Sequence, residues 1–110
     1  AHCRNTDKLN MAFIHMGEPV EIYVLDKTVR LLQPAAGFRT SLDSVMVAAA
    51  CPAQDGDSVL DLGCGVGAVG FCLLRRVPGA RVTGLDIQQE CVDLAAQNAG
   101  LNGRTAVFIQ

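Results

Sequence analysis

A glycine-rich segment follows directly on a short apolar run near the middle of the 110-residue chain. Residues 58–62 read Ser-Val-Leu-Asp-Leu, and residues 63–67 then carry glycine at every second position. A short apolar run of this kind is typical of a strand covered on both faces in a parallel sheet. Glycine lets the backbone approach a ligand closely, and the start of a helix presents free N–H groups. The segment therefore predicts a strand, a tight turn and a helix around a ligand site.

The residues after this turn continue the alternation of helix and strand. The predicted segments are a helix over residues 66–76, a strand over 81–86, a helix around 91–98 and a strand over 105–109. Gly103 follows the second helix as its stop signal. This order builds a parallel sheet with right-handed crossovers. We predict an α/β fold that contains the first half of a doubly wound domain.

The N-terminal half predicts a different unit. Residues 20–24 and 29–33 alternate apolar and polar positions around a turn at Asp26-Lys27, which indicates a hairpin. A helix over residues 42–51 follows, with Ser41 as its expected N-cap. We therefore divide the chain into residues 1–56, an arm with hairpin and helix, and residues 57–110, the ligand-binding α/β part.

Composition places the chain among soluble globular proteins. Half of the residues are apolar, 18% are charged and the net charge is −2. No apolar run is long enough for a transmembrane helix and no signal peptide is evident, so we expect a cytoplasmic protein without a membrane partner. The five cysteines form no Cys-x-x-Cys pair and no Cys/His cluster, so no metal site is expected.

Two classes of nucleotide ligand fit the glycine turn. Gly65, Gly67 and Gly70 match the dinucleotide fingerprint G-x-G-x-x-G, and Asp86 follows about twenty residues later, as in NAD enzymes. Asp61, however, lies near the end of the first strand, just before the turn, where its carboxylate would repel a pyrophosphate. Buried without a partner it would cost several kcal/mol, so we expect a cationic or hydrogen-bonding ligand beside it. S-adenosylmethionine, with an ammonium group, a sulfonium and no phosphate, fits better than NAD or FAD.

Two segments carry a family resemblance. Residues 59–67 (VLDLGCGVG) and 84–87 (GLDI) are similar to motif I and the acidic motif of class I S-adenosylmethionine-dependent methyltransferases. The resemblance implies a Rossmann-like fold and a cofactor site on the matching residues, with Asp86 on the ribose and Ile87 on the adenine. The implied cofactor-binding residues are Asp61, Gly63, Cys64, Gly65, Gly67, Asp86 and Ile87.

A narrower resemblance covers the flanking segments 31–34, 37–39, 42–50 and 98–103. With motif I, their order is similar to the bacterial tRNA adenine-N6 methyltransferases that act beside the anticodon of valine tRNA, and to their small-domain relatives. The resemblance implies a tRNA substrate and adds Arg39 and Asp43 as residues covering the cofactor. For Asp43, a charge favoured in the first turn of a helix is the equal alternative. Related enzymes methylate rRNA guanines or protein glutamines, and these acceptors stay open.

The acceptor-binding signature of that group, Asn-Pro-Pro followed by Tyr or Phe, is absent, and the four prolines are isolated. No residue is therefore nominated as catalytic, and we expect the chain to be the N-terminal part of a longer enzyme. The incomplete sheet is expected to leave an apolar edge through which the chain self-associates. Asn98 and Asn102 are expected at the surface and at a helix end.

Overall fold

This computed structural model describes residues 18–36 and 40–110 of the chain. Its elements are, in order, β1 (Val20–Val24), β2 (Val29–Gln33), α2 (Leu42–Ala50), β3 (Ser58–Leu62), α3 (Ala68–Arg76), β4 (Arg81–Leu85), α4 (Gln89–Leu101) and β5 (Val107–Ile109). β1 and β2 pair antiparallel as the predicted hairpin, whereas β3, β4 and β5 form a parallel sheet in that spatial order. The predicted α/β architecture is confirmed.

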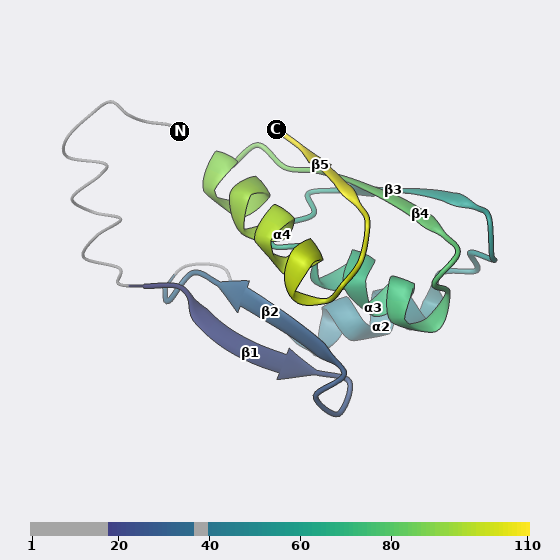
Figure 1. Cartoon of the computed structure of the whole chain (residues 1–110), viewed down its shortest axis with the longest axis horizontal. Coiled ribbons are helices and arrows are strands. Elements are labelled where there is room, and N and C mark those ends of the chain that lie inside the picture. Colours follow the sequence, from purple (N-terminus) through teal and green to yellow (C-terminus); the bar gives the residue numbers. More distant parts are fainter. Residues whose placement is uncertain (1–17, 37–39) are drawn as a thin grey trace.

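The elements form layers, with α3 and α4 between the parallel sheet and the β1–β2 hairpin (Figure 1). α4 contacts β2 on one side and β5 on the other, and α3 contacts β2 and β4. α2 packs along α3. The hairpin therefore covers the side of the helical layer that faces away from the sheet. In the described part of the chain no helix is long and apolar enough to cross a membrane.

One hydrophobic core joins the hairpin to the α/β part. The largest fully buried apolar side chains are Val29 and Leu31 of β2 and Phe71, Leu73 and Leu74 of α3. Phe71 also contacts Phe108 of β5, with ring centroids 5.6 Å apart. The parts before and after residue 56 share this core. The division of the chain into two units at that residue stays a prediction.

The other face of the parallel sheet carries exposed apolar side chains. Leu60 and Leu62 of β3 are 58% and 71% exposed, and Val107 and Ile109 of β5 are also exposed. Paired residues of neighbouring strands point to the same face, and the register aligns Leu60 with Val107 and Leu62 with Ile109 through β4. None of the described helices lies over this face (Figure 1). The apolar surface is thus a whole sheet face rather than an edge alone, and self-association stays a prediction.

Two details of the helices differ from expectation. Ser41 occupies the N-cap position of α2, but its side chain makes no capping hydrogen bond. Asn98 is fully buried in α4 rather than at the surface, because the hairpin covers that side of the helix. Asn102 is the C-cap of α4, as expected of a helix-end residue.

The C-terminal end of α2 is held by a side chain from α3. Arg76 donates from Nη2 to the carbonyl oxygens of Ala48, at 3.0 Å, and Cys51, at 2.6 Å. A cation there satisfies free carbonyls and complements the negative end of the helix dipole. α2 has no basic residue in its own last turn, so α3 supplies this charge.

The shared core predicts that the hairpin stabilises the α/β part. Leu31 is fully buried, so Leu31→Ala should lower the free energy of unfolding by about 2–5 kcal/mol in one cooperative transition. Leu42→Ala, at a leucine that is 70% exposed, should stay within about 0.5 kcal/mol. Thermal melts followed by circular dichroism measure both. A hairpin that unfolds separately and leaves the main transition unchanged would contradict the shared core.

Candidate functional site

The turn from β3 into α3 is held by the end of β4. The backbone N–H groups of Gly63 and Cys64 both donate to the carbonyl of Leu85, at 2.8 and 2.9 Å. The Gly65 N–H donates to Oδ2 of Asp86 at 2.8 Å, and the Gly67 N–H donates to the Cys64 carbonyl at 2.9 Å. The loop of residues 63–67 is therefore fixed by its own amides before any ligand binds.

This use of the amides decides which ligands the loop suits. A phosphate-binding glycine loop points its N–H groups at the anion. Here the N–H groups of Gly63, Cys64, Gly65 and Gly67 are all donated to acceptors within the protein. Two carboxylates, Asp61 and Asp86, stand beside the loop. The loop therefore offers little to a diphosphate and more to a neutral or cationic group.

The glycines of the loop serve two different purposes. Gly63 and Gly65 have φ of +72° and +56°, and a Cβ at either position would extend into open space. At Gly67, with φ of +93°, a Cβ would lie 2.5 Å from Cε2 of Phe71. Gly70 is also close-packed, although less tightly, because a Cβ there would meet Val82 of β4 at 3.0 Å. The first two glycines leave room for a ligand, and the latter two allow α3 to pack on the sheet.

Asp61 has an unpartnered oxygen at this site. Its Oδ2 is buried and makes no hydrogen bond within the described part of the chain. Burial raises the pKa of the carboxyl, and the charge of Asp86 raises it further. Because a carboxylate in this position lacks a compensating donor, the site suits a ligand that brings a cation or an N–H group.

Asp86 faces the loop from the end of β4 and is already engaged. Its Oδ2 accepts from Gly65 as described, and its Oδ1 accepts from the Gln88 N–H at 2.9 Å. Each carboxylate oxygen can accept a second hydrogen bond, so ligand hydroxyls can still bind. Its position is set by the backbone on both sides of the site.

Cys64 is a buried thiol close enough to both carboxylates to feel their charges. Burial raises its pKa to about 12, and the charges of Asp61 and Asp86 add to the effect. The Sγ donates weakly to the Gly65 carbonyl at 3.5 Å. A thiol with so high a pKa is a poor nucleophile, so the arrangement favours a binding role over covalent chemistry.

A cavity of about 80 Å³ opens beside the loop. It is lined by Gln33, Pro34, Thr40, Ser44, Asp61, Gly63, Cys64, Gly65, Val66, Ala68, Val69 and Cys91. Four of the predicted cofactor residues, Asp61, Gly63, Cys64 and Gly65, thus come together. In the described ranges no cluster of three or more metal-ligating side chains occurs.

Sequence reasoning missed three polar residues of this cavity. Gln33 is buried at the end of β2, and its Oε1 accepts from the Thr40 N–H at 2.9 Å. Ser44 lines the cavity from the first turn of α2. Only the resemblance of the segments around residues 31–34 and 42–50 drew attention to this region, since the residues lie far from the glycine loop in the chain.

The other predicted site residues that the structure describes, Asp86 among them, do not line the cavity. Asp43 is exposed in the first turn of α2, beside Ser44, and Gly67 is packed against Phe71. Ile87 is 87% exposed just after β4, outside the cavity. Arg39 lies outside the described residues. Cofactor-binding roles for these residues stay predictions.

The comparison with protein families decides the kind of site. Residues 59–110 match the family model described as a methyltransferase domain. This part of the chain is therefore similar to methyltransferase domains. The predicted resemblance to class I S-adenosylmethionine-dependent methyltransferases is confirmed. The match begins within β3, so the matched region includes the glycine loop, both carboxylates and α4.

Similar curated proteins are methyltransferases with different acceptors. A release factor glutamine methyltransferase of Chlorobaculum tepidum is 38% identical over 77 residues, covering 67% of this chain and 26% of that protein. The ribosomal RNA small subunit methyltransferase C of Aeromonas hydrophila is 34% identical over 103 residues, covering 80% and 30%. A tRNA1(Val) (adenine(37)-N6)-methyltransferase of a Flavobacteriaceae bacterium is 31% identical over 61 residues, covering 56% and 26%. The chain spans less than a third of each.

Solved structures support the fold. The tRNA (uracil-54, C5)-methyltransferase of Pyrococcus abyssi, solved with S-adenosyl-L-homocysteine, superposes with a TM-score of 0.66 at 24% identity. The likeness covers 84% of this chain and 24% of that one. The partial Rossmann-like fold predicted for the methyltransferase domain is thereby confirmed.

The raised pKa of Asp61 predicts a pH-dependent stability difference. The pKa of Asp61 is raised in the folded chain above its ordinary value of 3.8. The free energy of unfolding therefore falls as the pH rises from 3.8 through the raised pKa. Asp61→Asn removes this effect, so the variant should gain stability relative to the wild type across that interval and keep the gain above it. Thermal melts between about pH 3.5 and 7 measure the difference.

Asp26→Asn, at an exposed hairpin turn, is the matched control. Its stability difference from the wild type should not grow with pH. Parallel stability curves for Asp61→Asn and the wild type would contradict a destabilising carboxylate at position 61.

Proposed function

We propose that the protein carrying this chain is an S-adenosylmethionine-dependent methyltransferase whose donor site lies beside the glycine loop. The observation that carries the proposal is the buried, unpartnered Oδ2 of Asp61 in the wall of the cavity. The α-ammonium group of the cofactor supplies the charge and the N–H donors that this oxygen lacks. The family match over residues 59–110 supports the same cofactor.

The chain's own residues bind and orient in this proposal. Asp61 holds the cationic end, the open positions at Gly63 and Gly65 admit the ligand against the backbone, and Asp86 accepts from ribose hydroxyls. When bound, S-adenosylmethionine supplies an activated methyl group on a good leaving group. Transfer from such a donor depends mainly on proximity and orientation, which a loop fixed by its own amides provides.

For the acceptor, we propose RNA, and specifically the N6 amino group of an adenine in tRNA. Support comes from the tRNA1(Val) (adenine(37)-N6)-methyltransferase among the relatives and from the flanking segments that resemble this group. The rRNA methyltransferase that aligns with 80% of the chain supports RNA in general. We place this activity in the cytoplasm.

The donor proposal is tested by calorimetric titration of the full-length protein with S-adenosylhomocysteine and with NAD. The wild type should bind S-adenosylhomocysteine and give no heat with NAD. Asp61→Asn should weaken the former by roughly 10- to 100-fold, since a charge-assisted hydrogen bond is lost. Asp26→Asn should bind as the wild type does. Tight binding of NAD without S-adenosylhomocysteine would overturn the proposal.

The acceptor proposal is tested with methyl-labelled S-adenosylmethionine and the full-length protein. Unmodified tRNA should take up label, and nucleoside analysis should find it as N6-methyladenosine. Ribosomal RNA and a release factor serve as competing acceptors in parallel reactions. Label on a release-factor glutamine with none on RNA would replace the RNA proposal while leaving the donor proposal intact.

A further inference from the structure

α4 carries a fully buried asparagine on the side that faces the hairpin. Asn98 is 0% exposed, and both the oxygen and the nitrogen of its side-chain amide are hydrogen-bonded. Its Oδ1 accepts from the Leu32 N–H at 2.7 Å, and its Nδ2 donates to the Leu32 carbonyl and the Val66 carbonyl, each at 3.0 Å. A polar side chain at the centre of a helical layer is thus held by three backbone groups from two distant segments.

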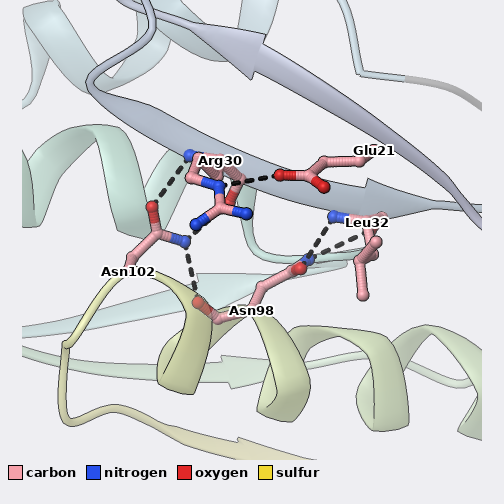
Figure 2. Close-up of polar contacts among 5 residues, drawn as sticks. All are labelled: Glu21, Arg30, Leu32, Asn98 and Asn102. Atoms are coloured by element: carbon pink, nitrogen blue, oxygen red, sulfur yellow. Dashed lines mark hydrogen bonds and ion pairs between the residues drawn. The ribbon is translucent and has the colours of Figure 1, made fainter.

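Asn102, one turn later, repeats part of this pattern. Its Oδ1 accepts from the Arg30 N–H at 2.8 Å, and its Nδ2 donates to the Arg30 carbonyl at 2.6 Å (Figure 2). Four residues of helix rise about 6 Å and two residues of strand about 6.6 Å, so the spacings match. The two asparagines therefore pair with the free edge of β2 much as a neighbouring strand would.

Only one of the two asparagines reaches the cofactor loop. Val66, whose carbonyl Asn98 holds, lies between Gly65 and Gly67, and both of these glycines have positive φ. On its other side Asn98 holds Leu32, the residue before the cavity-lining Gln33. The second donation of Asn102 goes to the Asn98 carbonyl within α4. One amide thus joins the glycine loop to the β2 wall of the same cavity.

We infer that Asn98 is a positioning residue for cofactor binding, which sets the glycine loop and the β2 end of the cavity relative to each other. The inference rests on the proposed donor site. It makes the hairpin a structural part of that site, because the loop is held by β4 through Leu85 and Asp86 and by β2 through Asn98. Asn98 itself does not line the cavity.

The two asparagines form a matched pair for the test. Asn98→Ala and Asn102→Ala each leave one residue of β2 without its side-chain partners, but only Asn98→Ala releases Val66. In the full-length protein, at a temperature well below both unfolding transitions, Asn98→Ala should weaken S-adenosylhomocysteine binding about 3- to 10-fold. Asn102→Ala should stay within twofold of the wild type. Hydrogen exchange of the amides of residues 63–67 should quicken in the first variant alone.

The outcomes separate the inference from the function on which it rests. Failure of the wild type to bind S-adenosylhomocysteine would remove the proposed donor site. Binding by the wild type and equally by Asn98→Ala, with unchanged exchange in the loop, would overturn the inference and leave the donor site standing. Equal losses of affinity in both variants would also overturn it, because the effect would then follow from loosening the hairpin.

A measurement on the unmodified protein covers the case in which Asn98→Ala does not fold. If Asn98 couples the loop to β2, saturating S-adenosylhomocysteine should slow exchange of the Leu32 amide as well as the loop amides, since coupling acts in both directions. The Arg81 amide lies at the end of β4 away from the loop and donates to the Asp57 carbonyl. Its exchange rate should change little. Slowed loop amides with an unchanged Leu32 amide would overturn the inference.

Discussion

The site depends on the hydrogen bonds that the amides of the glycine loop, residues 63–67, donate to acceptors within the protein. The parallel register pairs Leu62 with Leu85, so the turn after β3 begins beside the last residue of β4. There the Leu85 carbonyl receives two loop amides and Asp86 receives a third. Because these donors are used within the protein, the loop does not act as an anion cradle. The carboxylate of Asp61 then determines the charge that the cavity prefers.

The same carboxylate that gives the cavity a preference for a cation also lowers the stability of the folded chain. Its buried oxygen without a donor and its raised pKa both indicate that the charged form is unfavourable before a ligand binds. The shared core of β2 and α3, with the close packing at Gly67 and Gly70, offsets this cost. Binding sites often combine one unsatisfied polar group with a well-packed support, because a ligand can supply the missing partner.

The order of the elements and four of the cavity residues could be predicted from the sequence. Apolar runs, helical spacing and glycine turns are local signals, and they placed β1 to β4 almost to the residue. The role of Asn98 could not be predicted this way, because its hydrogen-bond partners lie in β2 and the glycine loop, which only tertiary packing brings to α4. Gln33 and Ser44 were missed for a similar reason, since tertiary contact alone brings them to the glycine loop. Asp43, selected by resemblance, lies one residue from the position that lines the cavity.

The layers explain why hairpin and loop act together. α4 lies between β2 and β5, so one side of this helix faces the hairpin (Figure 1). Its N-terminal end follows Asp86 in the chain. A buried amide on such a helix can form hydrogen bonds with the backbone of a strand and of a loop at the same time. Here Asn98 joins Leu32 of β2 to Val66 of the glycine loop in this way. Removing it leaves several buried groups unpaired at once, which costs more than the bonds are worth singly. A fully satisfied polar network of this kind specifies one arrangement of the hairpin and the loop, and that arrangement defines the cavity in which the cation of the methyl donor would bind Asp61.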